Sequence, residues 1–84
     1  MPGTELFGAE ERKEINDVLD SGILFRYNHD SLRNGHWKAK EFEAELAKFN
    51  KVNYAHAVSS GSTAVATAMA ACGIGAGDEV IVPP

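Results

Sequence analysis

The chain has 84 residues, a net charge of −4 and 24% charged residues. Because acidic and basic residues are interspersed without a basic run, we expect no nucleic-acid partner. No apolar run reaches about 18 residues, and the N-terminus lacks the pattern of a signal peptide, so we expect neither a membrane span nor secretion. The single cysteine, Cys72, cannot form an internal disulfide and is predicted to be a small buried residue. These features together favour a cytoplasmic protein.

Residues 1–53 are predicted to form a helical segment. A first helix begins at Gly8-Ala9, ends at Gly22 and carries an apolar stripe at Ile15, Val18 and Leu19. A second helix spans residues 37–49, with Asn50 expected just beyond its end. Its apolar stripe consists of Ala39, Phe42, Leu46 and Phe49. The charged residues of the first helix are expected to face solvent. In the second helix, Glu45 and Lys48 are expected to pair across one turn.

Residues 23–36, between these helices, are predicted to form a long loop. It contains Arg26 and Arg33, and arginine can bind a carboxylate or phosphate through two hydrogen bonds. Long loops are often functional, although an ordinary polar surface loop fits the same composition. The residues His29, Asp30 and His36 match no standard zinc-ligand spacing, so we predict no metal site.

Residues 54–84 are predicted to form a strand, a helix and a second strand. The first strand covers residues 54–59, the helix residues 62–72, and the second strand residues 79–83. Gly73 is expected just after the helix, which is small and apolar on all sides and should therefore be buried. A helix between two consecutive strands indicates a right-handed βαβ unit with parallel strands, and hence an α/β fold.

The turn before this last helix is a candidate phosphate site. The run Ser59-Ser60-Gly61-Ser62-Thr63 places hydroxyls and a glycine where unpaired backbone N–H groups and the positive end of the helix dipole meet. The same residues also fit a helix N-cap with no ligand. The run lacks the Gly-Lys-Ser/Thr ending of a Walker A loop and the glycine spacing of a dinucleotide fingerprint.

Two motifs carry a family resemblance. Residues 57–64 read Ala-Val-Ser-Ser-Gly-Ser-Thr-Ala, and residues 73–84 read Gly-Ile-Gly-Ala-Gly-Asp-Glu-Val-Ile-Val-Pro-Pro. Together they resemble the pyridoxal-phosphate-dependent sugar aminotransferases of the DegT/DnrJ/StrS family, which have the fold-type-I (aspartate aminotransferase-like) architecture. The residues from Pro2-Gly3 onward resemble the family's N-terminal helices. The resemblance therefore implies N-terminal helices followed by the first, incomplete βαβ unit of the large domain.

The resemblance also implies a cofactor, pyridoxal 5'-phosphate, whose phosphate is bound by Gly61, Ser62 and Thr63. The family usually has Thr followed by Ala where this chain has Ser62 and then Thr63, so either hydroxyl is a candidate donor. It further implies glutamate as the amino donor and a homodimer, since fold-type-I sites form between subunits.

For the substrate, the resemblance implies that the loop over residues 23–36 reaches toward a keto- or aldehydo-sugar. The candidate substrate-binding residues are Phe25, Arg26, Tyr27 and Arg33. The family's common Gly-Trp-x-Thr-x-Gly stretch is replaced here by residues 22–27. This region is similar to the branch that makes 8-amino-3,8-dideoxy-manno-octulosonate, a lipopolysaccharide sugar, from an acidic 8-oxo-3-deoxy-octulosonate. An anionic substrate would suit Arg26 or Arg33.

The chain is short for an enzyme of this kind. None of its five lysines lies in a setting typical of a nucleophile, and in the family the Schiff-base lysine and the acid beside the pyridine nitrogen come far beyond residue 84. We therefore expect an N-terminal fragment without catalytic residues, inactive by itself. Two alternatives are a complete small α/β module that binds a phosphorylated ligand without catalysis, and a purely structural unit that docks on a partner.

Overall fold

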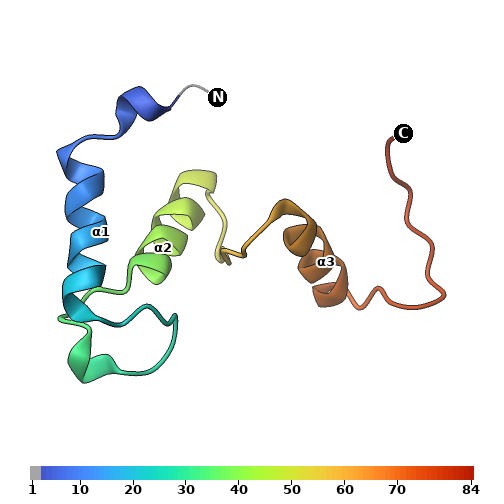
Figure 1. The fold of residues 1–84 in the computed structure, drawn as a ribbon. Coiled ribbons are helices and arrows are strands. Elements are labelled where there is room, and N and C mark those ends of the chain that lie inside the picture. The colour runs from blue at the N-terminus through green and yellow to red at the C-terminus, as the bar shows by residue number, and fades with distance from the viewer. Residues whose placement is uncertain (1–2) are drawn as a thin grey trace.

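A computed structural model describes residues 3–84 and shows helices joined by extended segments (Figure 1). In chain order these are a short 3-10 helix η1 (Thr4–Leu6), α1 (Ala9–Ser21), a second 3-10 helix η2 (Asp30–Leu32), α2 (Lys38–Asn50) and α3 (Gly61–Ala71). The three predicted α-helices are therefore confirmed, each to within about one residue at either end.

Local signals fix both ends of α1. The carboxylate of Glu11 accepts a hydrogen bond of 2.7 Å from the N–H of Gly8, which satisfies one of the free donors at the helix start. At the other end, Gly22 has a φ of +69° and donates to the carbonyls of Val18 and Leu19. This left-handed conformation is favourable for glycine and closes the helix where the sequence predicted.

Helix α2 ends one residue later than predicted. Trp37 precedes its first turn, and the carboxylate of Glu41 accepts from the Trp37 N–H at 3.1 Å. The left-handed residue after the helix is Lys51, with a φ of +55°, rather than Asn50. The side-chain amide of Asn50 donates instead to the carbonyl of Leu46 at 2.9 Å, so Asn50 stays within the last turn.

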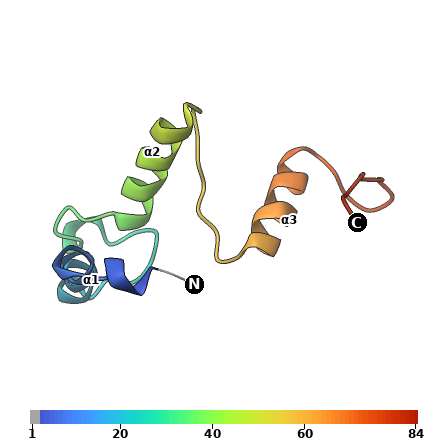
Figure 2. The ribbon, with the colours of Figure 1, turned by 90° about the horizontal axis from the view of Figure 1, so that it is seen from above.

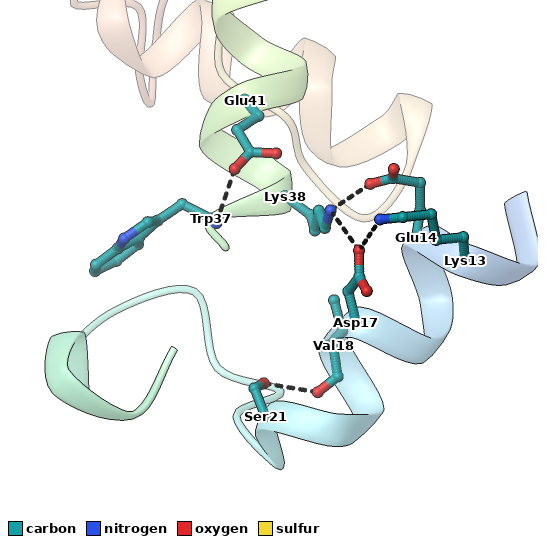
Figure 3. Close-up of polar contacts among 8 residues, drawn as sticks. All are labelled: Lys13, Glu14, Asp17, Val18, Ser21, Trp37, Lys38 and Glu41. Atoms are coloured by element: carbon teal, nitrogen blue, oxygen red, sulfur yellow. Dashed lines mark hydrogen bonds and ion pairs between the residues drawn. The ribbon is translucent and has the colours of Figure 1, made fainter. Parts of the chain in front are cut away.

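Charged side chains connect α1 to α2 (Figure 3). Lys38, the first residue of α2, forms ion pairs with Glu14 and, at 3.5 Å, with Asp17. Lys13 also pairs with Asp17, at 2.8 Å. The apolar stripe of α1 lines an open groove with Ile15, Val18 and Leu19, and Leu24 and Phe42 line it as well. Of the predicted α2 stripe, Phe42 is the residue that reaches this groove.

The predicted strands are not formed in residues 3–84, so the βαβ unit is not confirmed by the structure. The two segments lie on opposite sides of α3 in both views (Figures 1 and 2), and Tyr54 and Ile81 are almost fully exposed. Parallel strands are stable only with neighbours and with both faces covered. Residues 3–84 supply neither, which explains why extended backbone replaces a sheet here.

The described chain is open rather than compact. Its radius of gyration is 16.9 Å, whereas a compact domain of this length would have about 12 Å. Ala47 and Arg33 are the two buried residues among 3–84. The prediction that α3 is buried is wrong for these residues, because no residue of α3 is buried and Cys72 is exposed. Nothing in residues 3–84 packs over this apolar helix.

Within the same residues, no helix combines the length and the apolar character needed to cross a lipid bilayer.

Candidate functional site

Ser60 organises the turn at the start of α3. Its backbone is extended, and its hydroxyl oxygen accepts from the N–H of Thr63 at 3.1 Å. The same oxygen lies 2.9 Å from the hydroxyl of Thr63. Ser60 is thus a true N-cap, and both the backbone and the side chain of Thr63 are engaged with it.

The remaining donors of this turn are free. Within residues 3–84, neither the N–H groups of Gly61 and Ser62 nor the hydroxyl of Ser62 has a hydrogen-bond partner. Helix α3 contains no charged residue that would offset the positive end of its dipole. A Cβ built on Gly61 would meet no atom within 4 Å, so the space beside the turn is open. Free N–H groups, a hydroxyl and an open approach are the donor set that binds a phosphate.

Arg33 binds the backbone of its own loop. It is 5% exposed, and its guanidinium donates to the carbonyls of Asn28 at 2.7 Å, Tyr27 at 3.0 Å and Phe25. The guanidinium also stacks over the ring of Trp37, 4.2 Å from its centre. Arg33 therefore holds the curved backbone of the loop, and these contacts occupy donors that an anion clamp would need.

Arg26 keeps more of its donors. Its Nη2 atom donates to both carboxylate oxygens of Glu43, at 2.5 and 2.6 Å, and lies 3.3 Å from Nδ1 of His56. Its Nε atom is buried and has no partner among residues 3–84. The guanidinium lies 5.5 Å from the ring centre of Tyr27. Of the two arginines in the loop, Arg26 therefore keeps two nitrogens, Nη1 and Nε, without a partner among residues 3–84, whereas Arg33 keeps only Nη1.

The other two predicted substrate residues, Phe25 and Tyr27, are exposed at 69% and 58%. With Arg26 they line a shallow pocket on the loop. The structure does not bring this loop and the turn at Gly61 together: the loop lies beside the start of α2, whereas the turn opens α3 (Figures 1 and 2). The link between them is Glu43, which sequence reasoning missed.

Glu43 connects three segments of the chain. Besides Arg26, its Oε1 atom accepts from the N–H of Ala57 at 2.7 Å and lies 3.5 Å from Nδ1 of His56. The pKa of Glu43 is lowered, first by the hydrogen bond from Arg26 and then by the one from Ala57. Glu43 lies one turn before the buried Ala47, so it projects from the covered face of α2.

Lys13 and Lys38 are held as charged amines by acidic neighbours. The pKa of Lys38 is raised, mainly by its hydrogen bond with Glu14, and that of Lys13 is raised by its hydrogen bond with Asp17. A nucleophilic lysine needs a lowered pKa so that its amine is neutral near pH 7. Lys38 instead joins α2 to α1 through its ion pairs with Glu14 and Asp17, and Lys13 pairs with Asp17 within α1 (Figure 3).

Known proteins resemble this chain over most of its length. It is 47% identical over 75 residues to GDP-perosamine synthase of Vibrio cholerae, covering 89% of this chain and 18% of that protein. It is 39% identical over 79 residues to the spore coat polysaccharide biosynthesis protein SpsC of Bacillus subtilis, covering 94% of the chain and 18% of the relative. It is 43% identical over 70 residues to L-glutamine:2-deoxy-scyllo-inosose aminotransferase of Micromonospora echinospora, covering 82% of this chain and 16% of that protein.

The chain thus spans less than a fifth of the length of these relatives. The profile of the DegT/DnrJ/EryC1/StrS aminotransferase family matches residues 6–84. That match includes both helices of the N-terminal segment, the loop between them and the turn at the start of α3. The chain therefore belongs to the DegT/DnrJ/EryC1/StrS aminotransferase family, whose members have fold type I.

Proposed function

We propose that this chain is the N-terminal part of a pyridoxal-phosphate-dependent sugar aminotransferase, and that Gly61, Ser62 and Thr63 bind the phosphate of the cofactor. The observation that carries the proposal is the set of free donors at the start of α3. A dianionic phosphate supplies acceptors for these donors and interacts favourably with the helix dipole. Membership of the aminotransferase family directs the choice of phosphate ligand toward pyridoxal phosphate.

The contacts favour different roles for the two hydroxyl residues. The N–H and hydroxyl of Ser62 have no partner in residues 3–84, so Ser62 is the direct phosphate ligand. Thr63 is bound to Ser60 through both its N–H and its hydroxyl, so it shapes the turn and contributes a hydroxyl only by rotating away from that contact. Gly61 supplies an N–H and leaves room for the phosphate oxygens to approach.

On the substrate side, Arg26 with Phe25 and Tyr27 contacts the sugar, and Arg33 keeps their loop in shape. The Nη1 atom of Arg26, which has no partner among residues 3–84, suits a carboxylate, which supports an acidic keto-sugar of the 8-oxo-3-deoxy-octulosonate type. Glutamate is the proposed amino donor. The name of one relative specifies L-glutamine, so glutamine is the competitor to test against it.

When bound, pyridoxal phosphate would supply the electron sink that allows an amino group to move between two carbonyl carbons. In this chain, α3 binds and orients the phosphate, and the loop over residues 23–36 orients the sugar. The lysine that binds the cofactor covalently, and the acid beside the pyridine nitrogen, belong to the rest of a longer protein. We infer that residues 54–84 pair into a sheet there, that the protein is a homodimer, and that residues 1–84 alone are inactive.

A self-contained phosphate-binding module is the competing proposal. The same free donors support it, but the radius of gyration of 16.9 Å and the uncovered apolar helix α3 weigh against an independent domain.

The full-length protein tests the proposed function. Purified protein is incubated with pyridoxal phosphate, dialysed, and assayed for amino transfer from glutamate and from glutamine to an 8-oxo-3-deoxy-octulosonate and to a neutral keto-sugar. We expect retained cofactor, turnover with glutamate, and preference for the acidic sugar. Loss of all cofactor on dialysis, with no turnover of either sugar, would refute it.

A further inference from the structure

We propose that Glu43 is a positioning residue that ties the substrate-side loop to the segment entering the phosphate-binding turn. This inference rests on the proposed function and adds a residue to it. Glu43 would touch neither the cofactor nor the sugar. It would act through Arg26 on one side and through Ala57 on the other, so that one carboxylate fixes the position of the substrate-side loop relative to the phosphate-binding turn.

Both oxygens of the Glu43 carboxylate accept hydrogen bonds. Oε1 accepts from Arg26 at 2.5 Å and from the N–H of Ala57 at 2.7 Å, and Oε2 accepts from Arg26 at 2.6 Å. The partners lie 17 residues before and 14 residues after Glu43 in the sequence. The Glu43 side chain is only 11% exposed, so water competes little for these oxygens. Charge-assisted hydrogen bonds of this kind are among the strongest and most directional in proteins.

On the cofactor side, Glu43 fixes the approach to α3. Ala57 lies three residues before the N-cap Ser60, and its N–H has no strand partner in residues 3–84. The bond from Ala57 to Glu43 is therefore the backbone hydrogen bond that anchors residues 54–59 to α2. If it is lost, Ser60 and Gly61 are free to shift relative to the N-terminal helices, and the phosphate-binding turn loses its fixed place.

On the substrate side, Glu43 fixes Arg26 through one nitrogen and leaves other donors of the guanidinium free of it. Both carboxylate oxygens share the single Nη2 atom, which leaves the Nη1 of Arg26 without a partner in the described residues. An arginine held at one nitrogen presents its other donors in a defined direction, at little entropic cost on binding. His56, 3.3 Å from the same Nη2 and 3.5 Å from Oε1, closes the cluster.

The test measures the effects of Glu43 on cofactor binding and on the sugar KM separately, in the full-length enzyme. The variants are Glu43→Ala, Glu43→Gln, Arg26→Ala and the Arg26→Ala/Glu43→Ala double variant. Glu45→Ala and Glu45→Gln are the controls, because Glu45 is on the same helix and has no ion pair among residues 3–84. For each variant we would measure the cofactor dissociation constant by absorbance titration, KM and kcat for the keto-sugar, and the thermal midpoint.

We expect Glu43→Ala to raise both the cofactor dissociation constant and the sugar KM about tenfold, the effect of losing one hydrogen bond to a charged group. Glu43→Gln keeps an oxygen for Ala57 but loses the charge facing Arg26, so its KM should rise while cofactor binding stays within about threefold. In the Arg26→Ala background, Glu43→Ala should leave KM unchanged and still weaken cofactor binding.

Two results would overturn the inference while leaving the proposed function intact. One is a wild-type enzyme that binds cofactor and transaminates while the Glu43 variants match the Glu45 controls in both constants. The other is a KM effect of Glu43→Ala that adds in full to that of Arg26→Ala. If the wild-type protein itself retains no cofactor, the proposed function fails first, and the two failures are thereby distinguished.

Discussion

The substitution Gly61→Ala should improve folding and impair cofactor binding at once. The new Cβ would meet no atom of the protein within 4 Å, and Gly61 is not in the left-handed region, so alanine fits the backbone without strain. Replacing glycine by alanine at such a position stabilises a protein by about 0.4–1 kcal/mol, mainly by restricting the unfolded chain. The thermal midpoint of the full-length protein should therefore rise slightly.

The cost appears only when the phosphate is bound. The methyl group would occupy the open space beside the free N–H groups of Gly61 and Ser62, from which phosphate oxygens must accept. Losing one hydrogen bond to a charged group costs about 1.5–3 kcal/mol. This loss corresponds to a cofactor dissociation constant raised roughly ten- to a hundredfold.

The assay is a titration of the apo full-length protein with pyridoxal phosphate, followed by absorbance, beside a thermal melt. Gly75→Ala is the matched control, because a Cβ at Gly75 also meets nothing within 4 Å and that residue lies in the turn after α3. The control should leave cofactor binding unchanged. Unchanged cofactor affinity in Gly61→Ala, or a destabilised apo protein, would refute this reasoning.

Three further predictions concern the cap, the loop and the ion pairs. Ser60→Ala removes the N-cap of α3 and should lower the free energy of unfolding by about 1 kcal/mol, which a denaturant titration of the full-length protein measures. A change in this free energy of less than a few tenths of a kcal/mol would contradict the capping role. Arg33→Lys should raise the sugar KM without weakening cofactor binding, since lysine cannot hold the loop carbonyls together; wild-type kinetics would contradict it. The pKa values of Glu11 and Glu14 are lowered by hydrogen bonds from Gly8 and Lys38, so their stabilising effect exists above the unfolded pKa and disappears as pH falls. The thermal midpoint of the full-length protein should accordingly fall as the pH drops below about 4, and a midpoint that is flat down to pH 2 would argue against these contacts.

The helices were predictable because their signals are local. Gly22 and Gly73 adopt the left-handed conformations that the sequence suggested, and Ser60 caps α3 through its own hydroxyl. The end of α2 was misplaced by one residue because Asn50 and Lys51 can both adopt a left-handed conformation, and the contact of Asn50 with Leu46 decided between them.

Features that depend on distant residues were harder to predict. The strands expected over residues 54–59 and 79–83 need sheet neighbours that residues 3–84 do not contain. Arg33 was a candidate anion ligand, and sequence reasoning did not foresee that the left-handed backbone at Asn28 and His29 curves the loop so that its carbonyls bind Nε and Nη2 of the guanidinium. Glu43 gave no motif at all, because its partners come from both sides of the chain and meet only in three dimensions.

The central claim is that the turn at the start of α3 binds pyridoxal phosphate in a transaminating enzyme. The most direct measurement is the visible absorbance spectrum of the purified full-length protein with pyridoxal phosphate, recorded before and after addition of glutamate, for the wild type and for Ser62→Ala. We predict a cofactor band in the wild type that glutamate changes, and a band in Ser62→Ala that requires about tenfold more cofactor to reach half its height. A wild-type protein without a cofactor band, or a Ser62→Ala variant that binds cofactor as tightly as the wild type, would contradict the claim.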